Sequence, residues 1–121
     1  MITWYLLNNI NHISENEISV DVIVPQDSPW FCGHFPGDPV LPGIAQLGIA
    51  FDIAEQLRNV KLTGIKRVRF KKLIRPDDIL NIKAVISEEK SLSCSFKIMV
   101  KEEIACSGIF IIEEKINNES R

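Results

Sequence analysis

Hydrophobic and polar residues alternate along most of this 121-residue chain, which is the pattern of β-strands with one buried face. The clearest case is residues 17–24, where Ile18, Val20, Val22 and Val24 occupy every second position. Similar runs, separated by turn residues or charges, occur at 3–9, 62–70, 78–87, 91–100 and 103–112. The pattern therefore predicts two strands near the start of the chain and four consecutive strands in its second half.

Residues 42–59 break this alternation and predict a helix. Pro42 suits the first turn of a helix, where a backbone N–H is not needed. Apolar residues then recur at helical spacing at Ile44, Leu47, Phe51, Ala54 and Leu57. Further apolar residues fill the other flank of the first three turns, so we expect this helix to be buried on most sides.

One buried helix with six antiparallel strands predicts an α+β fold in which a single curled sheet wraps around a central helix. The length fits one domain over residues 1–121, with a polar tail at 113–121. A sheet of six strands leaves part of the helix or one sheet edge uncovered. A second subunit covers such a surface most simply, so we expect a homodimer or a close heterodimer.

Composition and charge exclude several classes of protein. The formal net charge of −2 argues against a nucleic-acid-binding protein, and no run of eighteen apolar residues predicts a membrane span. The first residues lack the basic segment and apolar core of a signal peptide, and three cysteines are too few and too scattered for a disulfide framework. We therefore predict a cytoplasmic, reduced protein.

Residues 30–43, WFCGHFPGDPVLPG, form the segment where chemistry is expected. Proline and glycine make it too irregular for a helix or a central strand, yet it is rich in apolar residues and contains His34. Such a loop can present an imidazole for acid–base work, although a turn histidine bonded to a backbone carbonyl would look the same. Cys32 invites a thiol nucleophile or a metal pair, but two histidines and three scattered cysteines form no recognised ligand set, so we expect no metal.

The segment GHFPGDPVLPG resembles the motif of the hotdog-fold (3R)-hydroxyacyl-(acyl carrier protein) dehydratases. VRFKKLIRPDDIL and EIACSGIF resemble two further, weaker segments of that family, so that the likeness covers most of residues 17–112. The resemblance implies a hotdog fold and an enzyme of fatty-acid or polyketide-type lipid synthesis. Its substrate would be a 3-hydroxyacyl thioester on the phosphopantetheine of an acyl carrier protein, converted to the trans-2-enoyl thioester with no other cofactor.

The resemblance also implies roles for single residues. His34 would be the acid/base group, and the free N–H of Gly43 at the helix start would polarise the thioester carbonyl. Phe35, Pro42, Gly48 and Phe51 would contact the substrate.

The family supplies a Glu or Asp fourteen residues after the histidine, contributed across the dimer interface to the departing hydroxyl, and this sequence departs from the family because Gly48 stands there. That glycine would serve a close contact at the dimer seam, a widened acyl tunnel, or both. Asp52 lies one turn further along the same helix face and would replace the missing acid through a bridging water. A carboxylate of the partner subunit is the alternative source of this group. Asp52 would then be an ordinary helix residue near a polar edge.

Residues 66–72, KRVRFKK, are predicted to form a basic strand with Arg67, Arg69 and Lys71 on one face and Val68 and Phe70 on the other. The resemblance implies that these three basic residues meet the acidic carrier protein, whereas the alternative is a solvated strand face. A single basic strand gives too few phosphate contacts for nucleic acid.

Three functions stay open at this point. The leading hypothesis is the dehydratase. The absence of a carboxylate at Gly48 favours instead a non-catalytic subunit that binds acyl chains or carrier protein and pairs with an active dehydratase. A hotdog thioesterase is the third hypothesis, disfavoured because that group generally lacks the His-Phe-Pro-Gly loop.

Overall fold

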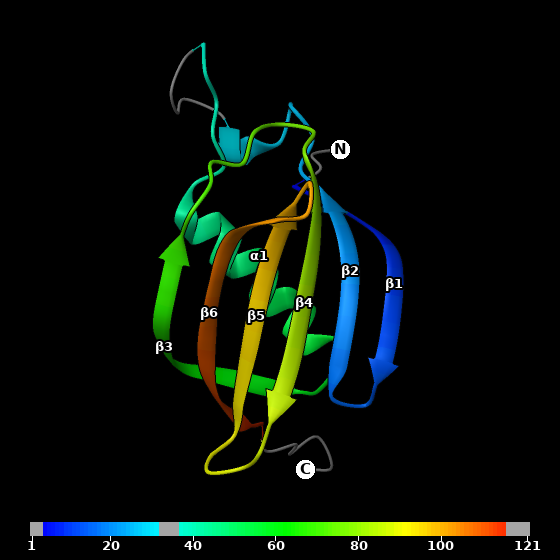
Figure 1. Ribbon diagram of the computed structural model, residues 1–121, viewed down its shortest axis with the longest axis vertical. Coiled ribbons are helices and arrows are strands. Elements are labelled where there is room, and N and C mark those ends of the chain that lie inside the picture. Colours follow the sequence, from blue (N-terminus) through cyan, green and yellow to red (C-terminus); the bar gives the residue numbers. More distant parts are fainter. Residues whose placement is uncertain (1–3, 32–36, 116–121) are drawn as a thin grey trace, which may run out of the picture.

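Six strands form one antiparallel sheet in the order β1-β2-β4-β5-β6-β3, as the computed structural model shows for residues 4–31 and 37–115 (Figure 1). The strands are β1 (Leu6–Ser14), β2 (Glu17–Ile23), β3 (Val60–Phe70), β4 (Ile79–Ser87), β5 (Ser93–Val100) and β6 (Glu103–Glu114). One turn of 3-10 helix, η1 (Pro29–Phe31), and a longer helix, α1 (Gly43–Glu55), separate the first two strands from the other four.

Helix α1 runs diagonally across one face of the curved sheet (Figure 1). The side chains that fill the space between them are apolar and come from every second position of β2, β4 and β5. Helix α1 contributes Ala45, Gln46, Ile49, Ala50, Ile53 and Ala54. The predicted α+β architecture, with a curled sheet around a helix, is confirmed.

The sheet does not cover the whole of α1. Ile44 is 77% exposed, and Gly48 and Asp52 also lie on the uncovered face, at intervals of one turn. The expectation that this chain leaves part of its helix bare is therefore confirmed, while the expectation of burial on most sides does not hold for this face. No helix within residues 4–31 and 37–115 is long and apolar enough to cross a membrane.

Helix α1 ends at Glu55, four residues before the predicted end. The N–H groups of Gln56 and Leu57 bond carbonyls only three residues back, which tightens and closes the last turn. The next side chain, Arg58, bonds to groups outside the helix.

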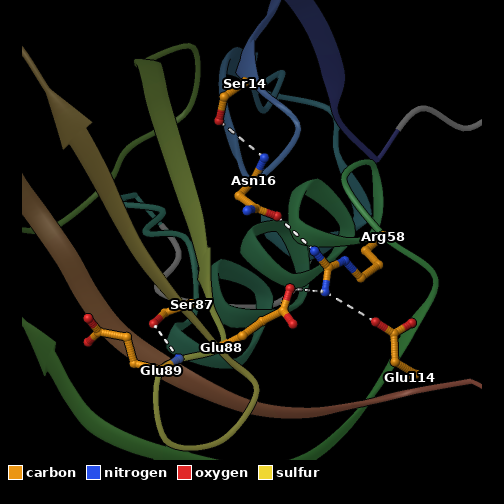
Figure 2. Close-up of polar contacts among 7 residues, drawn as sticks. All are labelled: Ser14, Asn16, Arg58, Ser87, Glu88, Glu89 and Glu114. Carbon is orange, nitrogen blue, oxygen red and sulfur yellow. Dashed lines mark hydrogen bonds and ion pairs between the residues drawn. The ribbon is translucent and has the colours of Figure 1, made fainter.

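Arg58 joins the end of α1 to three other segments (Figure 2). Its Nη1 lies 3.1 Å from Glu88 Oε2 and 3.2 Å from Glu114 Oε1, and its Nη2 donates to Asn16 Oδ1 at 2.8 Å. These partners belong to the β1–β2 turn, the β4–β5 loop and the end of β6. We call this group the Arg58 latch, and it fixes the end of the fold where α1 stops.

Three strands extend beyond their predicted bounds, and β3 does so by beginning at Val60 instead of residue 62. Strand β1 was predicted at 3–9 but runs to Ser14, because its polar second half still pairs with β2 across two register shifts. Strand β6 includes Glu113 and Glu114, which pair with Lys61 and Val60, so the predicted tail does not begin at residue 113.

Candidate functional site

Helix α1 begins beside the end of β3 (Figure 1). Pro42 is the N-cap in an extended conformation, and Gly43 is the first helical residue. The first N–H groups of a helix have no acceptor inside it, and no acceptor among the described residues is paired with that of Gly43. A β-carbon on Gly43 would lie 2.9 Å from Cζ of Phe70, so any larger residue here would have to displace the Phe70 ring.

A pocket of about 590 Å³ opens at this helix start. Its walls are residues 40–43, Gln46 of α1, and residues 70–73 at and after the end of β3. The walls are mainly apolar, with Lys71 and Lys72 at one side. The ammonium group of Lys72 lies 2.5 Å from a carboxylate oxygen of Glu103, whereas no ion pair of Lys71 occurs among the described residues. The predicted site residues Pro42 and Gly43 thus lie together in a pocket.

Three contacts hold the chain that leads into the pocket. The N–H of Leu41 donates to the carbonyl of Ile74 at 2.8 Å, and Nε2 of Gln46 donates to the carbonyl of Leu41 at 3.1 Å. Asp38 forms an exposed ion pair with Arg75. Because Leu41 is bonded through both its N–H and its carbonyl, the backbone just before Gly43 has a fixed position.

His34 and Phe35 lie outside the described residues, as does Cys32. Their predicted roles stay predictions. The described chain stops at the buried residue Phe31 and resumes at Gly37, six residues before the helix start.

A second, smaller pocket of about 290 Å³ lies between the uncovered face of α1 and β3. Gly48, Phe51 and Asp52 line it together, so three more of the predicted site residues share one cavity. A β-carbon added to Gly48 would meet no atom within 4 Å. Packing within the chain therefore does not explain this glycine, and both predicted explanations, a seam contact and a wider tunnel, depend on another molecule.

Asp52 has a partner that the sequence did not reveal. The hydroxyl of Tyr5 donates to Asp52 Oδ2 at 2.5 Å. The Tyr5 ring stacks on Trp30 at 5.9 Å between centroids, and Trp4 meets the same Trp30 edge-on at 5.1 Å. Burial, followed by the hydrogen bond to Asp52, raises the pKa of Tyr5 well above its ordinary value. Tyr5 was missed because it is 47 residues away in sequence and precedes the first strand.

The basic residues do not form the single row that was predicted. A register shift lies between Lys66 and Arg69, and Arg67 has a positive φ of 57°, so β3 contains a bulge at this point. Arg67 lines a hollow of about 410 Å³ away from the helix start, whereas Lys71 follows the end of β3 and lines the pocket beside Gly43. The prediction that Arg67, Arg69 and Lys71 share one face is wrong for Lys71, because the strand ends before it.

Comparison with known proteins now identifies the family. The model of the ApeI-like family, described as ApeI dehydratase, matches residues 10–109. The chain belongs to the ApeI-like dehydratase family. It is 36% identical over 93 residues to the 3-hydroxyacyl-(acyl-carrier-protein) dehydratase FabZ of Caldicellulosiruptor saccharolyticus, a match that covers 68% of this chain and 66% of that relative. It is also 32% identical over 115 residues to the FabZ of Syntrophobacter fumaroxidans, covering 85% of this chain and 78% of that relative.

Solved structures show the same fold in this ApeI-like chain. A chain of the dehydratase heterocomplex ApeI:P from Xenorhabdus doucetiae superposes with a TM-score of 0.76 at 23% identity, covering 88% of this chain and 96% of that one. A hypothetical thioesterase solved with coenzyme A from Streptococcus pneumoniae gives a TM-score of 0.70 at 14% identity, covering 93% and 88%. The predicted hotdog fold is confirmed, and because dehydratases and thioesterases share it, the fold alone does not choose between their reactions.

Proposed function

We propose that this ApeI-like chain dehydrates 3-hydroxyacyl thioesters carried on the phosphopantetheine of an acyl carrier protein. The observation that carries the proposal is the helix start at Gly43, which lines a pocket of about 590 Å³ and whose N–H has no acceptor among the described residues, in a chain of a dehydratase family. Backbone N–H groups at a helix start favour negative charge, which is what a thioester oxygen develops during this reaction.

The reaction needs a base, a carbonyl donor and an acid. His34 removes the proton from C2 of the acyl chain, and the electron pair moves onto the thioester carbonyl, whose oxygen accepts a hydrogen bond from Gly43 N–H. The pair then forms the C2–C3 double bond as the C3–O bond breaks. The departing hydroxide takes a proton from the acid and leaves as water, and the trans-2-enoyl thioester remains.

Asp52 is the carboxylate of this chain that we assign to the departing hydroxyl. It lies four residues after Gly48, about 6 Å further along the helix axis, and lines the small pocket on the uncovered face of α1, from which it would act across the dimer interface on the thioester bound by the partner subunit. The Tyr5 hydroxyl fixes one of its oxygens, which leaves the other for a water that bridges to the substrate. A protonated carboxyl group from another residue of a partner subunit is the alternative source of the proton.

The uncovered face of α1 and the neighbouring β3 support a dimer. Ile44 is 77% exposed, and Leu62 and Ile65 are each about 40% exposed beside it, at the edge of the sheet. Such an apolar edge invites a second hotdog subunit, either another copy or a related chain. Lys71 lines the pocket and would meet an acidic carrier protein at the substrate entrance, while Arg67 and Arg69 would contact the carrier further away.

A turnover assay tests the proposal. The purified chain is incubated with 3-hydroxybutanoyl carrier protein, and mass spectrometry follows the loss of water. We expect the enoyl product from the wild-type chain and from His12→Ala, an exposed histidine of β1, but not from His34→Ala. Release of the free acid instead of the enoyl product would show a thioesterase.

Gly48 favours a second candidate, the non-catalytic subunit that supports an active dehydratase. The family's carboxylate is missing there, and the next carboxylate, Asp52, is already bonded to Tyr5. If the wild-type homodimer shows no turnover while Gly48→Glu does, this second function replaces the first. If wild type is active and Asp52→Asn is not, the assignment of Asp52 stands.

A further inference from the structure

Gln46 has a buried carbonyl oxygen without a hydrogen-bond partner among the described residues. Only 4% of this residue is exposed, and its Nε2 donates to the carbonyl of Leu41 at 3.1 Å. That bond fixes which end of the amide is nitrogen, so the other end, Oε1, is the acceptor left unpaired. Natural proteins leave few such atoms, because an unpaired buried acceptor is destabilising.

The position of Gln46 suggests what the acceptor is for. It lies three residues after Gly43, in the first turn of α1, and lines the same pocket of about 590 Å³. The pocket is thus lined both by Gly43, whose N–H has no acceptor among the described residues, and by Gln46, whose Oε1 lies buried in the pocket wall. The bond from Nε2 to the Leu41 carbonyl explains the amide nitrogen of Gln46, but it does not explain the amide oxygen, which packing of the helix leaves unpaired among the described residues.

We propose that Gln46 is a positioning residue of this pocket, whose Oε1 accepts a hydrogen bond from the thioester bound at Gly43. The inference rests on the proposed function for the identity of the ligand. A 3-hydroxyacyl pantetheine thioester carries two kinds of donor that suit a neutral carbonyl: the O–H on C3 and the amide N–H groups of the pantetheine arm. Either would hold the carbonyl carbon in register with the Gly43 N–H.

Side-chain NMR of glutamine tests the contact directly. The chain has three glutamines, and Gln26 and Gln56 are exposed, so they serve as internal controls. The side-chain carbonyl and amide signals are recorded in the His34→Ala chain, which leaves the probe unconsumed, and Gln46→Met assigns the signal. The probes are 3-hydroxybutanoyl-pantetheine and butanoyl-pantetheine.

We expect the Gln46 signals to shift on binding while those of Gln26 and Gln56 stay in place. A shift with the hydroxylated probe alone assigns the donor to the C3 hydroxyl, and a shift with both probes assigns it to the pantetheine arm. A bound probe that moves the Gly43 amide signal but leaves Gln46 unchanged overturns the inference. So does the absence of any shift at either residue.

Kinetics supply a second measurement, in the wild-type background. Gln46→Met keeps the length of the side chain but removes its hydrogen bonds, so kcat/KM should fall about tenfold to hundredfold, mostly through KM if the contact forms equally in ground and transition states. The matched control Gln56→Met should retain wild-type values. Full activity of Gln46→Met would overturn the role of Gln46 and leave the proposed dehydratase function intact. If instead the NMR signals of Gln46 shift on binding but the wild-type chain never forms enoyl product, the contact stands and the dehydratase function is wrong.

Discussion

Replacing Gly48 with alanine should stabilise the isolated chain. Gly48 is exposed in the interior of α1, and a β-carbon there would meet no atom within 4 Å, so the substitution changes helix propensity and little else. Glycine is about 0.5–1 kcal/mol less favourable than alanine at such a position. For a chain of this size that gain corresponds to a rise in melting temperature of about 2–4 °C.

The same substitution at Gly108 is the matched control, with the opposite sign. A β-carbon there would lie 2.9 Å from the ring of Phe96, which is buried and stacked on Phe110 at 4.5 Å. A methyl group at this position would force the buried, stacked Phe96 ring to shift, so Gly108→Ala should cost about 1–3 kcal/mol.

Thermal unfolding by circular dichroism, repeated over a hundredfold range of protein concentration, measures both variants. A gain for Gly48→Ala at every concentration favours the wider tunnel as the reason for this glycine. A gain that becomes a loss as concentration rises shows that a second copy packs against Gly48. A loss at the lowest concentration, where single chains prevail, would refute the reasoning, because it would require a neighbour that the structure does not contain.

Three further predictions concern the pocket, the latch and the buried thiols. Gly43→Ala should lower kcat/KM at least tenfold, because its methyl group displaces the Phe70 ring and crowds the backbone N–H. The Phe70 ring is half-exposed and can move, so the free energy of unfolding should fall by less than about 1 kcal/mol. Unchanged kinetics would argue against Gly43 as the donor. Arg58→Ala should lower the free energy of unfolding by about 1–2 kcal/mol in urea denaturation, since it removes the whole latch, and a value within error of wild type would show that the latch contributes nothing. Burial raises the pKa of the Cys94 and Cys106 thiols to about 11, whereas a thiol in the unfolded chain has a pKa of about 8.5. The unfolded chain therefore loses these protons at lower pH, and the free energy of unfolding should fall as pH rises from about 8.5 to about 11. Under reducing conditions Cys94→Ala should make that fall smaller, and a fall equal to that of wild type would contradict the assignment.

Alternation and helical spacing predicted the elements of the fold well, because each strand of the core has one face against α1. The boundaries were less predictable where local sequence and pairing disagree. Strand β1 continues through the polar residues after Asn9 because β2 offers backbone partners, a tertiary effect that side-chain patterning does not report. The bulge in β3 is likewise set by pairing with β6, and it displaced the predicted row of basic residues.

The candidate site was predictable as far as a continuous motif carried it. Pro42 and Gly43 follow from the helix-start pattern, and the structure adds the reason for Gly43, the ring of Phe70 from a strand 27 residues later. Tyr5 and Gln46 were missed for a different reason. The sequence shows a tyrosine in a predicted strand and a glutamine in a predicted helix, but only the folded chain shows that Tyr5 bonds to Asp52 and that Gln46 has an oxygen without a partner among the described residues.

The central claim is that an imidazole at position 34 moves the proton at C2 of a thioester bound at the start of α1. Running the reaction backwards in D₂O tests it most directly: trans-2-butenoyl-pantetheine is hydrated, and mass spectrometry and NMR locate the deuterium in the 3-hydroxy product. We expect one carbon-bound deuterium at C2 with the wild-type chain and with His12→Ala, and a rate at least a hundredfold lower with His34→Ala. Equal rates of deuterium incorporation with and without His34 would contradict the account.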